Sequence, residues 1–443
     1  MRPDGADLFD RIMHNLPAPD AILRGSRGRA AQTLEANTHV HLPPNFSSFP
    51  SAAAAAAQAR REGVGVLGIS NYYGTGGYGE FAAACLAEGV FPLFGMEIIV
   101  RFEGVREASG RVPSGRIASG GVPHPPGRIN DPQNPGKMYL CGKGLLPCRR
   151  GATANPTLES IIRIDRARAV GIIEKLCSHA SSAGLSICLD AETISKAVAE
   201  DCKVDRGEIV LQERHIARAA ALAIDACPAA ERRERWRAIL GTDEEVTRAL
   251  DTAGAARDIA MQDVLRKRLL KSGRPCYVPE KYIDFEDAAG LVRDLGGIIA
   301  YPVLADGASQ VCEFESDSRT LVANLQKLGI NAVEFIPARN EAGTLAEYVE
   351  ALEEEGFVMT GGTEHNTPRG APLILSCRGG EALPRRAAEL FARGARILAA
   401  HSYLRARGEK TPLGDGRADR GTLDELANLG GRVIEAFTGE RGM

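Results

Sequence analysis

The chain of 443 residues lacks several features that would assign it to a class directly. It contains no run of about 18 apolar residues, so no membrane-spanning helix is expected. The start of the chain holds no apolar segment, so no signal peptide is expected either. The ten cysteines form no CxxC pair, and the nearest two are Cys141 and Cys148. Scattered cysteines in a chain of this length indicate reduced thiols, and we therefore expect a cytoplasmic protein.

An excess of charge of one sign is also missing. Lysine and arginine number 54 against 57 aspartate and glutamate residues, for a formal net charge of −3. Without a general basic field, nucleic acid is not an expected partner, and a small-molecule substrate is. Aromatic residues make up only 5% of the chain, but a hydrophobic content of 44% is enough for a sizeable core. The composition leaves the oligomeric state open.

What the sequence does contain is an alternation of short apolar segments with helical segments. The alanine-rich stretch after Ser51 predicts a helix with Ser51 as its N-cap and Gly63 at its end. The apolar segments 64–70 and 90–94 predict buried strands. Strands and helices that alternate with short links are typical of a parallel sheet or barrel. The expected fold class is therefore α/β.

Departures from this alternation mark the expected domain boundaries. Residues 103–137 are rich in Gly, Pro, Ser and Arg, which predicts a long loop or lid near the active face. From about 206 to 272 the pattern is helical and heavily charged, which predicts an insertion. We divide the chain into an N-terminal arm (1–36), a first part of the barrel (37–204), a helical insertion (205–280), a second part of the barrel (281–380) and a C-terminal helical segment (381–443).

Two histidines close an apolar segment in the sequence Thr-His-Val-His-Leu. His39 and His41 are two residues apart, so on a strand their imidazoles point to the same side. Two imidazoles at a strand end suit a metal better than a core, because imidazole is a common neutral ligand for zinc, iron or manganese. The motif alone leaves open the alternative of two partly exposed structural histidines.

Acidic residues follow two other predicted strands. Glu97 follows one apolar segment, and the pair Glu364-His365 follows another. The carboxyl ends of parallel strands in a barrel meet at one face, where active sites are found. His39, His41, Glu97 and one of Glu364 or His365 are therefore the predicted ligands of one divalent cation, namely zinc, manganese or iron. Adjacent residues on an extended chain diverge, so the sequence leaves open which of the last two binds.

Taken in order, these motifs resemble the PHP (polymerase and histidinol phosphatase) superfamily. The order is the His-x-His pair, Gly95-Met96-Glu97, a helical insertion, Gly-Gly-Ile-Ile-Ala-Tyr-Pro ending at Pro302, and Gly-Gly-Thr-Glu-His ending at His365. The insertion is similar to that of a branch that includes bacterial phosphoesterases acting on nucleoside bisphosphates and RNA ends. The resemblance covers roughly residues 35 to 375. It implies a distorted (β/α)7 TIM-like barrel of PHP type with a helical insertion and C-terminal helices.

The chain departs from this family at several metal ligands. Where the family has histidines, this chain has Tyr72, Tyr139 and Tyr301, and Asn366 replaces a fourth. The ligands that remain are those that share one of the three metals usual in the family, so the resemblance implies a one-metal site. Tyrosine is a rare ligand but a good hydrogen-bond donor, so we expect the three tyrosines to line one cavity and suit a polyhydroxylated ligand. The alternative is that they mark an enzyme that has lost its activity.

Two basic residues are further candidates. Lys143 lies between two glycines after a predicted strand, where its ammonium is placed to bind phosphate or carboxylate. Arg339 follows another predicted strand and is a candidate for substrate binding. A solvated side chain is the alternative for each. The Gly-rich runs near 74–79 and 104–121 lack the strand and helix context of a nucleotide-binding loop, so no organic cofactor is expected.

These observations lead to one main expectation and two alternatives. The main expectation is a metal-dependent hydrolase, phosphoesterase-like on a small phosphorylated metabolite, in which the cation polarises a substrate oxygen or activates water. The predicted catalytic residues are Tyr72, Tyr139, Tyr301, Lys143 and Arg339, with the last two replacing the charge of a second metal. One alternative is a one-metal hydrolase, isomerase or lyase that acts on a sugar or sugar acid. The other is a PHP homologue that binds a metabolite without catalysis.

Overall fold

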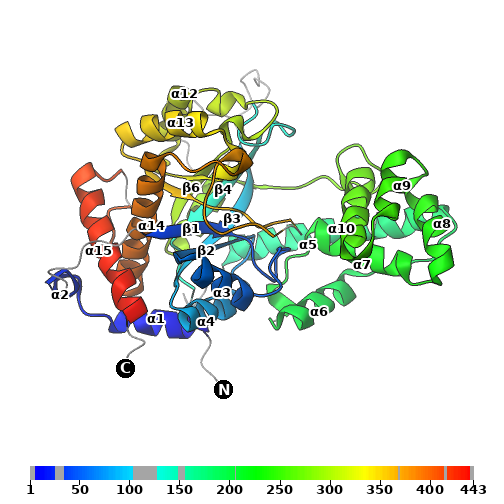
Figure 1. The fold of residues 1–443 in the computed structure, drawn as a ribbon, viewed down its shortest axis with the longest axis horizontal. Helices are drawn as coiled ribbons and strands as arrows, with labels where there is room; N and C mark the ends of the chain where they lie inside the picture. The colour runs from blue at the N-terminus through cyan, green and yellow to red at the C-terminus, as the bar shows by residue number, and fades with distance from the viewer. Residues whose placement is uncertain are drawn as a thin grey trace.

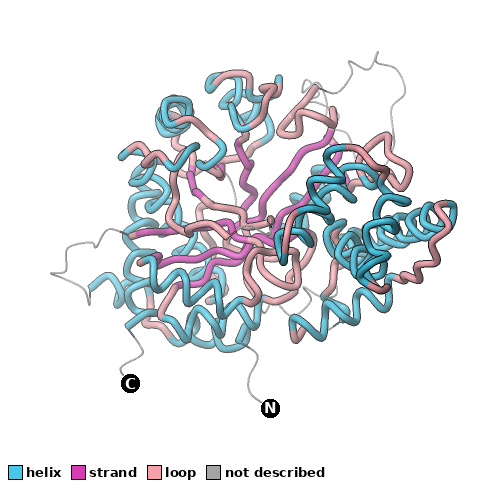
Figure 2. The backbone as a smooth tube through the Cα atoms, turned by 45° about the vertical axis from the view of Figure 1, so that its right-hand side comes forward, coloured by secondary structure: helices cyan, strands magenta, loops and turns pink. Residues whose placement is uncertain are grey.

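The sheet at the centre of the molecule curves into a nearly closed barrel (Figures 1 and 2). The computed structural model describes residues 5–24, 34–102, 127–147, 155–204, 206–367, 370–413 and 417–439. In spatial order the strands are β1 (Glu35–Val40), β2 (Val64–Tyr72), β3 (Phe91–Arg101), β4 (Lys137–Lys143), β6 (Ile298–Val303), β7 (Ala332–Phe335) and β8 (Val358–Gly361). The short β5 (Ile283–Asp284) pairs with the end of β3. A bridge between Val40 and Glu364 brings the two edges together. The predicted α/β class is confirmed.

One strand runs against the others, which the expectation of a parallel barrel did not include. β4 is antiparallel to both β3 and β6, whereas the remaining neighbours are parallel. The ladder between β3 and β4 continues to a hydrogen bond of 2.9 Å from the Phe102 amide to the Gly136 carbonyl, so the chain returns beside the strand that it has just left. An antiparallel return of this kind needs no crossover helix. Residues 103–126, the larger part of the predicted lid, lie outside the described residues.

Helices cover the outside of the barrel, and their ends follow the predicted signals. The N-cap Ser51 accepts a hydrogen bond of 3.2 Å from the Ala54 amide, and Gly63 ends that helix with φ 76°. Both predicted caps are confirmed. The surrounding helices are α1 (Gly5–Asn15), α2 (Pro19–Arg24), α3 (Ala52–Glu62), α4 (Tyr78–Glu88), α11 (Phe285–Asp294), α12 (Ser318–Leu328) and α13 (Ala342–Glu354). The C-terminal helices α14 (Arg385–Ala406) and α15 (Arg420–Gly439) pack on each other.

A helical lobe stands on the opposite side of the barrel from α14 and α15 (Figure 1). It has its own apolar core, whose members span residues 169–276 and include the fully buried Trp236 and Leu265. Its helices are α5 (Pro156–Ser182), α6 (Ala191–Cys202), α7 (Glu213–Asp225), α8 (Ala229–Leu240), α9 (Glu244–Asp251) and α10 (Gly254–Leu265). The second half of α5 and α6 pack in this core together with the residues of the predicted insertion (205–280).

Among the residues that the structure describes, no helix combines the length and the apolar character needed to cross a membrane.

Candidate metal centre

Two imidazoles and a carboxylate converge where β1 and β3 meet the mouth of the barrel. His39 Nε2 lies 3.3 Å from His41 Nε2 and 3.6 Å from Glu97 Oε2, and the distance from His41 Nε2 to Glu97 Oε2 is 3.3 Å. All three side chains are almost fully buried. The two histidines share a side because they are two residues apart, and Glu97 reaches them from β3 across the adjoining β2.

The chemistry of this cluster fits a bound cation. Although Glu97 Oε2 is buried, it has no hydrogen-bond partner in the part of the chain that the structure describes. Burial would raise the pKa of Glu97, but its interactions with His39 and His41 hold that pKa well below its usual value. One carboxylate and two imidazole nitrogens leave further coordination positions open, as catalytic zinc and non-haem iron sites do. The residues that would hold the metal are therefore His39, His41 and Glu97.

A second carboxylate supports this cluster from within the barrel. Glu334 of β7 accepts a hydrogen bond of 2.6 Å from Nδ1 of His39, and its other oxygen accepts one of 2.8 Å from Thr38. A carboxylate on Nδ1 fixes the tautomer and ring orientation of a metal-bound histidine and leaves Nε2 free to bind. Burial acts to lower the pKa of His39, but the charge of Glu334 raises it well above its usual value. Sequence reasoning missed Glu334, although a single acid within an apolar strand was visible.

Lys143 has a different position from the one predicted. Because β4 is antiparallel, its carboxyl end lies away from the barrel mouth, and Lys143 points into the barrel interior. Its ammonium lies 2.7 Å from Glu334 and donates to the Thr38 carbonyl at 2.9 Å. With a side chain 3% exposed, it does not line the cavity that holds the ligand cluster. The structure therefore places Lys143 where it neutralises Glu334 and out of reach of a substrate.

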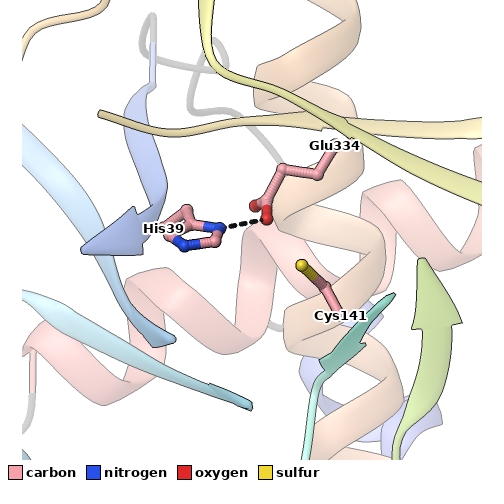
Figure 3. A group of neighbouring side chains, drawn as sticks. All are labelled: His39, Cys141 and Glu334. Carbon is pink, nitrogen blue, oxygen red and sulfur yellow. Dashed lines mark hydrogen bonds and ion pairs between the residues drawn. The ribbon is translucent and has the colours of Figure 1, made fainter. Parts of the chain in front are cut away.

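Cys141 forms a second possible ligand group with His39 and Glu334, shown in Figure 3. The side chains face one another from β1, β4 and β7, and their potential ligand atoms lie within 4.8 Å. Burial raises the pKa of the Cys141 thiol to about 11, and the Lys143 ammonium already neutralises Glu334. This group is therefore less suited to a cation than the cluster at His39, His41 and Glu97.

The two remaining predicted ligands have partners outside the cluster. The Glu364 carboxylate pairs with the Arg339 guanidinium and accepts a hydrogen bond of 3.1 Å from Asn366. His365 uses both ring nitrogens elsewhere, at 2.8 Å from the Thr363 hydroxyl and 2.9 Å from the Ala371 carbonyl. Neither belongs to the described group of converging ligand atoms. Both side chains are thus engaged by partners other than the two histidines.

Two of the three predicted tyrosines reach the site. Tyr72 stacks on the ring of His41 with a centroid distance of 4.8 Å, and Tyr139 lines the same cavity. Burial raises the pKa of Tyr72 well above its usual value and that of Tyr139 to about 12, so both hydroxyls remain protonated. Tyr301 is placed elsewhere: its hydroxyl donates to the Ile129 carbonyl and to Glu315. Tyr301 is fully buried and does not line the cavity, although its neighbour Pro302 does.

A cavity of about 360 Å³ opens onto the cluster. Its charged and polar lining consists of His39, Tyr72, Glu97, Asn130, Asp131, Tyr139, Arg339, Glu364 and Asn366. Arg339, the remaining predicted substrate-binding residue, is at this cavity, with its side chain 43% exposed. The cavity therefore combines possible metal ligands with one guanidinium and two tyrosine hydroxyls.

A second cavity of about 300 Å³ lies between the barrel mouth and the helical lobe. Tyr72, Tyr139 and Asn366 line both cavities and so separate them. Six cationic side chains and three carboxylates line the second one: Lys137, Arg168, Arg214, Arg266, Lys271, Lys281, Asp165, Glu213 and Glu280. The lobe thus contributes to a cationic compartment next to the candidate metal centre.

Comparisons with known proteins leave the chain without an assigned family. No protein-family model matches it, and no curated protein does. One similar solved structure is an amidohydrolase from Chromobacterium violaceum with bound sulfate and no metal; identity is 16%, coverage 80% of this chain and 96% of that chain, and the TM-score 0.46. Another is from Bifidobacterium adolescentis and is provisionally named a metal-dependent phosphoesterase; identity is 14%, coverage 82% and 98%, and the TM-score 0.49.

Proposed function

We propose that this chain is a metal-dependent phosphoesterase, a divergent member of the PHP superfamily whose distorted (β/α)7 barrel keeps one metal site. The observation that carries the proposal is the convergence of His39 Nε2, His41 Nε2 and Glu97 Oε2 beside a cavity at the barrel mouth. A divalent cation bound there supplies a Lewis acid that polarises a phosphoryl oxygen or activates water.

The chain's own groups complete the site around the phosphoryl group. Arg339 offers a guanidinium whose fork matches two phosphate oxygens, and its charge replaces part of what a second metal would supply. Tyr72 and Tyr139 stay protonated, so they act as hydrogen-bond donors that orient the substrate and not as bases. Residues of the lobe line the neighbouring cavity, and we expect the lobe to limit the access of water to the mouth, which strengthens these interactions.

The substrate that this arrangement favours is a small phosphorylated metabolite with a second anionic part. The cationic lining of the second cavity exceeds the acidic lining by three charges, from six cations and three carboxylates. A reducing cytoplasm is the proposed location, and the nine cysteines of the described residues are free thiols in keeping with it.

Metal analysis combined with ligand deletion tests this proposal. Purified protein should contain one equivalent of zinc, manganese or iron, and His39→Ala and His41→Ala should lose it while keeping the far-UV circular dichroism of the parent. The control is His179→Ala, which removes a lobe histidine whose Nε2 lies 3.2 Å from the Ile239 carbonyl. Full metal content in both site variants would contradict the proposal, and so would the absence of phosphatase activity in metal-loaded protein against a panel of phosphate monoesters.

A one-metal enzyme acting on a sugar or sugar acid is the second candidate. The observation in its favour is that Tyr72 and Tyr139 place two hydroxyl groups on the cavity wall, where they suit a polyhydroxylated ligand. Turnover of sugar acids without phosphatase activity would support this candidate, and Tyr72→Phe should then weaken binding by about 1 kcal/mol for the lost hydrogen bond.

A further inference from the structure

The main chain of Glu364 is fixed directly beside the two histidines of the metal centre. Its amide donates to the His39 carbonyl at 2.9 Å, and its carbonyl accepts from the His41 amide at 2.7 Å. Residues 364 and 365 have φ values of 64° and 56°. Consecutive residues other than glycine rarely adopt this left-handed region, because it is sterically unfavourable for a residue with a Cβ atom. The hydrogen bonds to His39 and His41 hold the chain in this conformation, so the side chain of Glu364 starts next to the metal centre.

The carboxylate of Glu364 is nevertheless engaged elsewhere. It pairs with Arg339 and accepts a hydrogen bond of 3.1 Å from Asn366. Its side chain is 15% exposed and lines the same cavity as His39 and Glu97. A carboxylate that extends from a backbone pinned between two ligands, into their own cavity, needs only side-chain rotation to approach them.

The Arg339 guanidinium, which holds this carboxylate, is accessible from the cavity. The Arg339 side chain is 43% exposed, and within the part of the chain that the structure describes it forms an ion pair with Glu364. A tetrahedral oxyanion in the cavity offers a guanidinium more acceptor oxygens than one carboxylate does, in a geometry that suits its fork. The Glu364 carboxylate and the oxyanion therefore compete for the Arg339 guanidinium.

We propose that Arg339 and Glu364 form a latch operated by a tetrahedral oxyanion, such as a phosphate or sulfate group. When the oxyanion enters the cavity it takes the Arg339 guanidinium, and Glu364 is released to become a fourth ligand beside His39, His41 and Glu97. The latch rests on the metal site of the proposed function and adds a regulation to it. No covalent bond changes, because one ion pair is exchanged for another ion pair and a metal–oxygen contact.

The latch makes two affinities interdependent. If the oxyanion tightens metal binding by some factor, the metal must tighten oxyanion binding by the same factor. Metal and oxyanion each bind more tightly when the other is present, so the four-ligand site is favoured when substrate is bound.

Calorimetric titration with Zn2+, with and without inorganic sulfate, tests the latch without an activity assay. In the parent protein, sulfate should increase the Zn2+ affinity by about 5-fold or more. Glu364→Gln should keep the parent's Zn2+ affinity without sulfate and lose most of this increase. Arg339→Gln should show a higher Zn2+ affinity than the parent without sulfate, because the Glu364 carboxylate is already free. Sulfate should then increase the Zn2+ affinity of this variant little further. The control Arg386→Gln removes an exposed ion pair with Glu353 and should behave like the parent.

Several outcomes would overturn the latch. An equal increase with sulfate in the parent and both site variants would mean that sulfate acts on the metal directly. A Glu364→Gln variant weakened equally with and without sulfate would make Glu364 a permanent ligand. Zn2+ binding with no effect of sulfate would remove the latch and leave the proposed function intact, whereas a parent protein that binds no Zn2+, manganese or iron would remove both.

Discussion

At the scale of single residues, the candidate metal centre requires a glycine at position 362. A Cβ atom at Gly362 would lie 2.2 Å from Cβ of His39 and 2.8 Å from its Cα. Main-chain atoms of β1 cannot yield to such a contact without shifting the histidine. Gly362 is therefore part of the site although it binds nothing.

Gly362→Ala should consequently lower both metal affinity and stability. Overpacking at a tight contact costs about 1–3 kcal/mol, and a displaced His39 should lose metal affinity in addition. The control is Gly370→Ala, since a Cβ there meets nothing within 4 Å. Denaturant unfolding and metal titration of the two variants provide the measurement, and equal behaviour of the two would contradict the idea.

A second residue-scale prediction separates the two roles of Glu334. Glu334→Gln leaves the Lys143 ammonium buried without its counter-charge, which should cost about 3–5 kcal/mol. The double variant Glu334→Gln/Lys143→Met removes both charges and should recover much of that loss. Both variants should bind metal roughly 10–100-fold more weakly, because His39 loses the carboxylate on Nδ1 in each. Recovery of metal affinity together with stability in the double variant would show that Glu334 acts only through the fold.

The sequence predicted the candidate metal ligands better than the residues that support them. His39, His41 and Glu97 meet because strand alternation and adjacent strands bring them together, and both follow from local patterns. The Glu334–Lys143 pair was not predictable, because it joins β4 to β7 inside the barrel. The turn of Glu364 away from the cluster depends on Arg339, which is distant in sequence, and on a left-handed backbone that no propensity scale anticipates.

At the scale of elements, the direction of β4 decides which residues can reach a ligand. Its first residues lie at the barrel mouth and its last residues lie at the opposite end. Tyr139 therefore lines the cavity, whereas Lys143 does not. An apolar run specifies a strand without its direction, so hydrophobic pattern alone could not distinguish these two outcomes.

The docking of α14 should make the protein sensitive to acid. His401 of this helix is 1% exposed, and its ring nitrogens contact the Thr411 hydroxyl and the Gly296 carbonyl, each at 2.8 Å. Burial lowers its pKa to about 4, and Arg405 contributes in the same direction. The folded state thus binds this proton less readily than the unfolded state. The contribution of His401 is complete above pH 6.5 and is lost as the pH falls towards 4, by up to about 3 kcal/mol.

Urea unfolding between pH 7.5 and 4.5 measures this effect. The parent should lose stability steadily below pH 6.5, and His401→Gln should lose less over the same interval, although it starts from a lower value because of the altered hydrogen bonds. Parallel pH profiles for the two proteins would assign the acid sensitivity to other groups.

At the scale of the whole molecule, the described residues form two apolar cores, one in the barrel and one in the helical lobe. The only tryptophan, Trp236, is fully buried in the lobe, where its indole donates to Asp225 at 2.8 Å. Tryptophan fluorescence therefore reports on the lobe alone, whereas far-UV circular dichroism reports on all helices and strands.

Metal should separate the unfolding of these two parts. A ligand that binds only the folded barrel stabilises it by mass action, by about 2.7 kcal/mol at a concentration 100 times its dissociation constant. In thermal unfolding, saturating zinc should raise the midpoint of the part of the circular dichroism transition that reports on the barrel. It should raise the midpoint of the fluorescence transition much less. The same comparison with His39→Ala is the control. Coincident transitions that move together would show that the lobe and barrel unfold as one cooperative unit.

Alternation of strands and helices was enough to predict the α/β class and both C-terminal helices, because these depend on local periodicity. The beginning of the lobe was harder to locate. Helical periodicity continues through α5, and only the three-dimensional partners of its two halves reveal that Leu158 and Ile161 belong to one core while Ile172 and Leu176 belong to the other.

This division gives α5 a mechanical role. A helix of 27 residues is about 40 Å long, and its hydrogen-bonded backbone is far stiffer than a loop. One end of α5 packs in the barrel core and the other in the lobe core, so this stiff helix connects the two parts rigidly. Any rocking of the lobe over the barrel mouth must then bend the return connection, residues 271–282, where the described chain is mainly turns and extended segments. The width of the cavity beneath the lobe therefore depends on the stiffness of α5, on this connection and on the hydrogen bonds that join Gln212 of the lobe to Asn45 and Phe46 of the barrel.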